Sequence, residues 1–191
     1  MITHLNGRLI EKTPTALIIE CGGIGYEVKV SLHTYTKVGD QESVKIFTQF
    51  IVREDAQLLY GFADREEREM FNFLISVSGI GPNTAILMLS SLTPSDVAQA
   101  IHSEDVNTIK SVKGIGLKTA QRVIVDLKDK MLKFEVSDEN IGHSNNTIRF
   151  DALTALISLG FDRKMADKAL TKVFSDQGTV ELLIKDALKV L

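Results

Sequence analysis

Ser76-Val77-Ser78-Gly79-Ile80-Gly81-Pro82-Asn83-Thr84-Ala85 recurs 35 residues later as Ser111-Val112-Lys113-Gly114-Ile115-Gly116-Leu117-Lys118-Thr119-Ala120. Seven of the ten positions are identical, and each copy lies between two apolar segments of helical character. A short turn with two glycines between two helices is typical of a helix-hairpin-helix element. The repeat therefore predicts an all-α middle domain, residues 63–133, that contains two such hairpins.

Each hairpin has the features of a phosphate-binding turn. Glycines at both hairpin positions would allow backbone conformations closed to other residues and let a phosphate approach the chain. The next residues begin a helix, so their unpaired N–H groups and the positive end of the helix dipole would face an anion. A single Gly-x-Gly is more often an ordinary turn between packed helices, but two copies with the same flanks favour phosphate binding. Such contacts read DNA shape rather than base sequence.

The side chains around the second hairpin favour the same interpretation. Lys118 and Arg122 lie one helical turn apart, where they would add positive charge beside a bound phosphate. The expected DNA-binding residues are Gly79, Gly81, Asn83, Thr84, Gly114, Gly116, Lys118, Thr119 and Arg122.

The overall charge of −3 does not exclude DNA, because the charge is unevenly distributed. Residues 63–106 carry 2 Lys/Arg and 7 Asp/Glu, whereas residues 107–133 carry 7 Lys/Arg and 2 Asp. A phosphate responds to the potential within about 10 Å rather than to the charge of the whole chain.

The first 62 residues have the pattern of β-strands. Residues 17–21 lead through Gly22-Gly23 into the alternation of Tyr26, Val28 and Val30, which predicts a β-hairpin. Residues 44–52 and 57–62 form a second predicted hairpin that turns at residues 53–56. About five short strands in this length suit a small barrel, for which the OB type is a natural candidate.

The C-terminal part differs in composition. Residues 134–147 are polar and rich in Asn and Ser, which predicts a flexible linker. Residues 148–191 show three short amphipathic helices, with breaks at 160–162 and 175–178. The predicted fold class is α+β multidomain: an N-terminal OB-type barrel (1–62), the helix-hairpin-helix domain (63–133), the linker (134–147) and a C-terminal three-helix, UBA-like bundle (148–191).

Several classes of protein are disfavoured. The one cysteine, Cys21, cannot form an internal disulfide, and there is no apolar run of about 18 residues and no signal peptide. A cytoplasmic protein without a membrane segment is the expectation.

No catalytic or cofactor site is indicated either. Residues 117–119 resemble the end of a P-loop, but leucine stands where that motif needs glycine. Some helix-hairpin-helix DNA glycosylases have a nucleophilic lysine where Lys118 stands, but the aspartate they also need would fall on Val136. The four histidines (His4, His33, His102 and His143) are scattered without metal-ligand spacing and are expected singly at the surface. We expect no enzymatic activity, no metal and no cofactor.

The chain as a whole resembles the RuvA family of proteins that bind Holliday junctions. The resemblance lies in residues 7–9, 22–28 and 155–161, in the paired hairpins and, most specifically, in residues 52–62. It implies a four-fold homotetramer, or two tetramers paired into an octamer, that holds an open four-way DNA junction. The implied partners are the hexameric ATPase RuvB, which would consume the ATP, and the resolvase RuvC.

The resemblance also implies roles for single residues. Glu54 and Asp55 match an acidic pin that would guide strands apart at the junction centre by repelling phosphates. The positions that match contacts to RuvB are Leu156, Leu159, Phe161 and Leu188, for which burial in the core of the bundle is the alternative.

Two positions depart from the family. It commonly has lysine where this chain has Asn83, and often two consecutive lysines where this chain has Leu117-Lys118. Fewer cationic contacts to DNA would make binding less dependent on salt. A general duplex-DNA adaptor without junction preference remains the alternative function.

Overall fold

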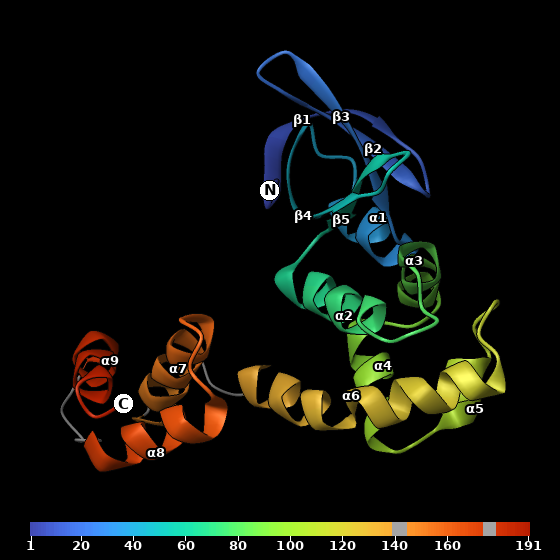
Figure 1. The fold of residues 1–191 in the computed structure, drawn as a ribbon. Coiled ribbons are helices and arrows are strands. Elements are labelled where there is room, and N and C mark those ends of the chain that lie inside the picture. Colours follow the sequence, from blue (N-terminus) through green and yellow to red (C-terminus); the bar gives the residue numbers. More distant parts are fainter. Residues whose placement is uncertain (139–144, 174–178) are drawn as a thin grey trace. The chain divides into compact units, whose positions relative to one another are not determined.

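A computed structural model describes residues 1–138, 145–173 and 179–191. The chain divides into two compact units, Met1–Lys133 and Phe134–Leu191. The first unit contains the barrel and the two hairpins, and the second contains the C-terminal helices (Figure 1).

The first five strands close into a barrel in the order β1-β2-β3-β5-β4. Apolar residues at every second position point inward, as in Leu17 and Ile19 of β2 and Val28 and Val30 of β3, all of which are buried. The prediction of an OB-type barrel is confirmed. The strands are β1 (His4–Lys12), β2 (Ala16–Cys21), β3 (Ile24–Val30), β4 (Ser43–Val52) and β5 (Gln57–Phe62).

Gly61 lies where the parallel strands β3 and β5 meet, opposite Val30. A Cβ at this position would lie 2.4 Å from Cγ1 of Val28 and 2.7 Å from Cγ2 of Ile46. These distances leave no room for a side chain, so glycine permits the close approach of β5 to the barrel core.

A short helix, α1 (Leu32–Val38), lies between β3 and β4 and was not expected from the sequence. The Ser31 hydroxyl caps it by accepting a hydrogen bond from the Thr34 N–H group.

The apolar core of the barrel extends to the helical region of the first unit. Phe71 of α2 packs on Tyr60 and Phe62 of β5, with ring centroids 5.2 and 4.9 Å apart. The barrel and the start of the helical region are therefore joined by one apolar core rather than by a linker. The helices are α2 (Arg65–Ile75), α3 (Pro82–Ser91), α4 (Pro94–His102), α5 (Val106–Lys110) and α6 (Leu117–Asp138).

The second unit is a bundle of α7 (Asn145–Ser158), α8 (Arg163–Val173) and α9 (Val180–Leu188), in agreement with the predicted bundle. Its core is small and consists mostly of alanine and leucine side chains: Ala152, Leu156, Ala166, Ala169, Leu170, Leu183 and Ala187.

The linker prediction for 134–147 was partly wrong, because α6 extends to Asp138 and α7 begins at Asn145. Residues 139–144 and the predicted break at 175–178 lie outside the described residues. Within the described parts, none of the helices combines the length and the apolar character needed to span a membrane.

Candidate nucleic-acid interface

The two hairpins have the same local structure. Gly79 and Gly114 have φ angles of +97° and +92°, in the region that favours glycine. The isoleucine that follows each glycine is buried, and its N–H group bonds the carbonyl of Val77 or Val112 at 3.0 or 3.1 Å. The repeated sequence thus produces a repeated turn, anchored in the core by Ile80 and Ile115.

The second glycine of each hairpin has a different role from the one we expected. Gly81 has φ −88° and ψ 167°, which any residue can adopt, and Gly116 is not in the left-handed region either. A Cβ added to either glycine would meet nothing within 4 Å. These positions are open to solvent, so the absence of a side chain leaves the backbone accessible to a ligand.

The helix that starts at the first hairpin has uncommitted donors at its N-terminus. Its N-cap, Gly81, supplies no side-chain hydrogen bond, and its first residue, Pro82, has no N–H group. The first helical hydrogen bond runs from the Ala85 N–H group to the Gly81 carbonyl, at 3.0 Å. The N–H groups of Asn83 and Thr84 therefore point out of the helix end, where an anion would be stabilised.

The second hairpin has the same arrangement. The Ala120 N–H group bonds the Gly116 carbonyl at 2.9 Å, which leaves the N–H groups of Lys118 and Thr119 at the start of α6.

The two turns lie side by side. A Cβ at Gly79 would be 3.9 Å from both Cγ2 and Oγ1 of Thr119, at the start of α6. Further along α6, Lys130 Nζ donates to Ser76 Oγ at 3.2 Å. The predicted DNA-binding residues of the two repeats are therefore brought together on one surface.

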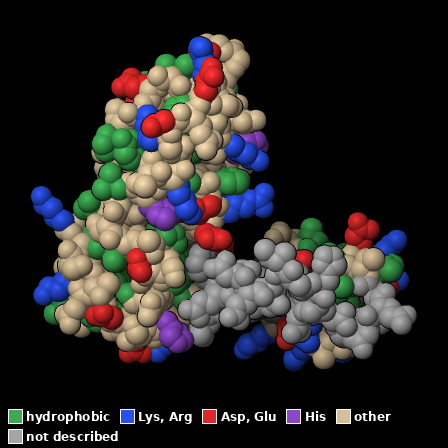
Figure 2. Space-filling view, turned by 180° about the vertical axis from the view of Figure 1, so that it is seen from behind, with side chains coloured by type: hydrophobic (Ala, Val, Ile, Leu, Met, Phe, Trp, Pro, Cys, Tyr) green, Lys and Arg blue, Asp and Glu red, His purple; other side chains and the backbone are tan. Residues whose placement is uncertain are grey.

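Cationic side chains are concentrated at the second hairpin. Lys113, Lys118 and Arg122 are exposed, and none of them forms an ion pair with the described residues. Lys128, by contrast, pairs with Glu104. On the face of the molecule in Figure 2, acidic and basic side chains are interspersed. A phosphate would therefore be attracted by the local positive charge at the second hairpin and not by a uniformly basic surface.

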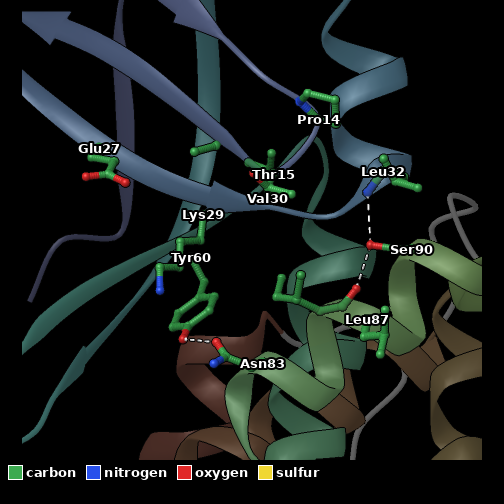
Figure 3. A pocket seen from close by; sticks show the side chains of 12 residues that line it. Pro14, Thr15, Glu27, Lys29, Val30, Leu32, Tyr60, Asn83, Leu87 and Ser90 are labelled. Carbon is green, nitrogen blue, oxygen red and sulfur yellow. Dashed lines mark hydrogen bonds between the residues drawn. The ribbon is translucent and has the colours of Figure 1, made fainter. Parts of the chain in front are cut away.

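Asn83 lies in the first turn of α3 and is exposed, but its side chain is not free. Its Oδ1 accepts a hydrogen bond of 3.0 Å from the Tyr60 hydroxyl (Figure 3). No local sequence pattern predicts this contact, because 23 residues separate the two partners.

The acidic residues Glu54 and Asp55 lie exposed at the predicted tip between β4 and β5. A hydrogen bond of 2.8 Å from the Arg53 N–H group to the Ala56 carbonyl closes the turn. The two carboxylates are thus presented to solvent by a short, well-formed hairpin.

The four predicted RuvB contacts in the second unit do not form one exposed set. Leu156 is fully buried in the bundle core, which favours the core role that was its alternative. Phe161 is partly buried against the same core, whereas Leu159 and Leu188 are 62% and 44% exposed. Met165 and Leu182, which were not predicted from the sequence, are also exposed and apolar.

A buried carboxylate, Glu67, lies between α1 and α2. The hydroxyl of Thr34 donates to Glu67 Oε2 at 2.5 Å, and that of Ser31 donates to Oε1. Burial raises the pKa of Glu67, although the two hydroxyl groups oppose this shift. The network connects the end of the barrel to the helix that leads to the first hairpin.

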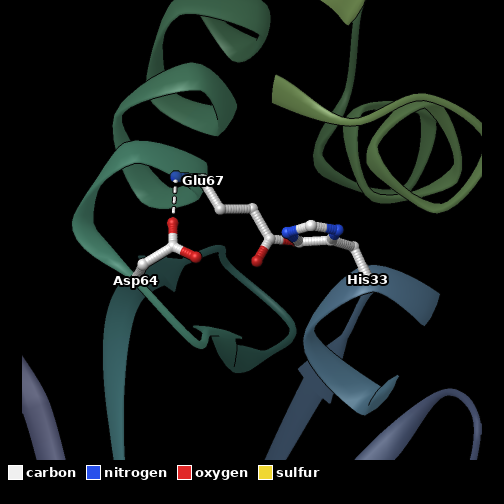
Figure 4. A group of neighbouring side chains, drawn as sticks. All are labelled: His33, Asp64 and Glu67. Atoms are coloured by element: carbon white, nitrogen blue, oxygen red, sulfur yellow. Dashed lines mark hydrogen bonds between the residues drawn. The ribbon is translucent and has the colours of Figure 1, made fainter. Parts of the chain in front are cut away.

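His33, Asp64 and Glu67 form the cluster that comes closest to a metal site, with ligand atoms within 4.8 Å of one another (Figure 4). His33 is half-buried here, not at the surface as we expected; His143 lies outside the described residues. The carboxylate oxygens already have partners, since Asp64 accepts from the Glu67 N–H group at 2.8 Å and from Lys37 Nζ at 2.7 Å. A cation would have to displace the Lys37 ammonium group, so this geometry favours a hydrogen-bonded contact between α1 and α2 over a metal site.

Known protein families match the chain in three consecutive parts. The RuvA N terminal domain matches residues 1–61, a SAM-like helix-hairpin-helix tandem matches 71–129, and the RuvA C-terminal domain matches 148–191.

Complete proteins are similar over the whole length. The chain is 54% identical over 193 residues to a protein of Christiangramia forsetii, 51% over 193 residues to one of Flavobacterium psychrophilum and 51% over 198 residues to one of Cytophaga hutchinsonii. Each alignment covers 100% of both chains, and each relative is named Holliday junction branch migration complex subunit RuvA. Since the barrel, the paired hairpins and the C-terminal bundle occur here in the same order as the matched domains, the chain belongs to the RuvA family.

Proposed function

We propose that this protein binds four-way (Holliday) DNA junctions by their shape, holds them open and recruits the RuvB motor for branch migration in recombination and repair. It acts as a scaffold rather than an enzyme, and the RuvB hexamer hydrolyses the ATP. The names of the three relatives, each a subunit of the branch migration complex, support this function.

The observation that carries the proposal is the adjacency of the two hairpins, with Gly79 next to Thr119. Two N-terminal helix ends on one surface bind neighbouring phosphates of one backbone, with Lys118 and Arg122 adding charge. These contacts are to the phosphate backbone and not to base edges. Binding that does not depend on base sequence is required of a protein that must act on junctions of any sequence.

A four-fold assembly would match the shape of the substrate. A junction has four equivalent arms, and a homotetramer with four-fold symmetry presents one pair of hairpins to each arm. Glu54 and Asp55 of the four copies then surround the junction centre, where they repel phosphates and keep the strands apart. Two such tetramers paired across the junction form an octamer, and the resolvase RuvC is the further proposed partner.

The second unit supplies the contact to RuvB. Leu159 and Leu188 are the proposed contacts, with Phe161 partly exposed beside the core. We propose that these side chains belong to one contiguous apolar patch, the feature that marks a docking site for a partner protein.

A competition experiment tests the proposed function. Full-length protein is bound to a labelled four-way junction and challenged with unlabelled linear duplex of equal length in gel-shift assays at moderate salt, while light scattering gives the mass of the complex. We expect the junction complex to survive excess duplex and to contain four or eight chains of 21.1 kDa. Equal competition by duplex would support the general duplex-DNA adaptor instead.

A further inference from the structure

Tyr60 connects the barrel to the first hairpin. It lies in β5, the strand that leads away from the acidic tip, and its ring is 1% exposed and packs on Phe71. Only its hydroxyl group reaches out of the core, into a cavity between the barrel and α3, where it donates to Asn83 Oδ1 at 3.0 Å (Figure 3). Burial raises the pKa of Tyr60, with nearby Arg53 opposing, so the hydroxyl stays protonated and remains a donor at neutral pH.

The orientation of Asn83 decides what it offers to DNA. A carboxamide has a donor end and an acceptor end, whereas a phosphate has only acceptor oxygens. An unrestrained amide can turn either end outward. The Tyr60 hydroxyl donates to the acceptor, Oδ1, and thereby leaves the two N–H bonds of Nδ2 available to another partner on this exposed residue.

We propose that Tyr60 is a positioning residue for DNA binding: its hydroxyl holds Oδ1 of Asn83 so that Nδ2 donates to a phosphate at the first hairpin. The proposal rests on the function proposed above. It assigns a neutral donor to the first hairpin and leaves the cationic contacts to Lys118 and Arg122 of the second.

The rest of α3 supports this role. At its other end, Ser90 Oγ accepts a hydrogen bond of 3.0 Å from the Leu32 N–H group at the start of α1. The helix is therefore held against the barrel at both ends, near its first turn by Tyr60 and near its last turn by α1. The first hairpin consequently keeps a fixed position relative to β5 and its acidic tip.

The test is a double-mutant cycle on the full chain with Tyr60→Phe, Asn83→Ala and the double variant. Tyr60→Phe removes one oxygen and keeps the ring in the core, so the thermal unfolding curve serves as the control for folding. We expect each single variant to weaken junction binding by about 2- to 10-fold, the range for one hydrogen bond. The double variant should bind no more weakly than Asn83→Ala, because both changes remove the same contact.

Salt dependence distinguishes positioning from a general loss of structure. Neither Tyr60→Phe nor Asn83→Ala removes a cation, so the slope of log K against log salt should equal that of the unchanged protein. Lys118→Gln is the matched comparison and should make the slope shallower by about 0.9 for each phosphate that is no longer neutralised.

A rescue variant completes the design. In Asn83→Lys the ammonium group needs no orientation by a hydroxyl, so adding Tyr60→Phe to it should change the affinity less than about 2-fold, the lower limit for one hydrogen bond. The proposal is overturned if Tyr60→Phe alone binds like the unchanged protein, or if it weakens binding equally with Ala at position 83. If the unchanged protein shows no junction preference but the double-mutant cycle still couples Tyr60 to Asn83 in DNA binding, the proposed function fails and the role of Tyr60 in binding DNA stands.

Discussion

Glu54 and Asp55 are acidic residues in a protein whose proposed ligand is a polyanion. Both are exposed at the tip between β4 and β5, on a turn closed by Arg53 and Ala56. Carboxylates at such a tip cannot attract phosphates, and they raise the electrostatic energy of a strand that passes close to them. The proposed contribution of these two residues is therefore to exclude strands from the junction centre, not to bind them.

Neutralising the tip should not weaken binding. We expect the double variant Glu54→Gln/Asp55→Asn to bind a four-way junction as tightly as the unchanged protein, or more tightly. Any gain should be largest at low salt, where charges are screened least. Fluorescence anisotropy at two salt concentrations measures this, and Glu11→Gln/Glu42→Gln, exposed acids elsewhere in the first unit, is the matched control. A large loss of affinity in the tip variant alone would contradict the pin role.

At the scale of elements, the hydrogen-bonded contact between α1 and α2 contains a titratable group, the carboxylate of Glu67. Burial raises the pKa of Glu67 above its ordinary value of 4.5, so the folded chain holds this proton more tightly than the unfolded chain. The stability that comes from this group is complete below pH 4.5 and is lost as the pH rises through the folded pKa. The pKa of Asp64 is lowered, because Lys37 and the Glu67 N–H group outweigh its burial. Its contribution to stability therefore has the opposite pH dependence and decreases as the pH falls.

Glu67→Gln should therefore lose less stability than the unchanged protein between pH 4.5 and neutral pH. All three tyrosines (Tyr26, Tyr35 and Tyr60) lie in the first unit and the chain has no tryptophan, so tyrosine fluorescence during urea unfolding reports on that unit. Glu69→Gln, an exposed position on α2, is the control and should leave the pH dependence unchanged. Parallel curves for Glu67→Gln and the unchanged protein would rule out this assignment.

Elements with a local signal could be predicted from the sequence, and those that depend on distant contacts could not. The strands follow from period-two alternation and the hairpins from the repeat around Gly79 and Gly114. By contrast, α1 has the sequence Leu-His-Thr-Tyr-Thr-Lys-Val, whose β-branched residues disfavour a helix. It is stabilised by the Ser31 cap and by the hydrogen bond from Thr34 to Glu67, 33 residues away.

The same distinction explains the candidate site. The duplicated motif predicted both hairpin turns, but only the fold shows that Gly79 and Thr119 are neighbours. Helical spacing would place Leu156 and Leu159 on similar faces, but α7 ends at Ser158. Leu156 is buried in the core of the bundle, whereas Leu159 lies in the turn after α7 and is exposed. Because residues 134–147 are polar, they were predicted to be a linker, and the continuation of α6 to Asp138 was not predicted.

At the scale of the whole molecule, the division into two units separates the proposed DNA contacts from the proposed RuvB contacts. Every proposed DNA contact lies in Met1–Lys133, and every proposed RuvB contact lies in Phe134–Leu191. A chain that ends after Asp138 keeps α6 whole, together with its buried residues Leu127 and Met131.

We expect this shortened chain to bind a four-way junction with unchanged affinity and to lose both RuvB recruitment and ATP-driven branch migration. Leu159→Ser in the full chain should reproduce the loss, because it removes an exposed apolar side chain while the bundle keeps its core. Leu156→Ala should act differently, since truncating a buried leucine costs about 2–5 kcal/mol and unfolds a small bundle. Circular dichroism separates the two cases, and pull-down with RuvB on immobilised junctions measures recruitment. If the shortened chain still recruits the motor, the RuvB contact must lie in the first unit, and the exposed leucines of α7 to α9 need another explanation.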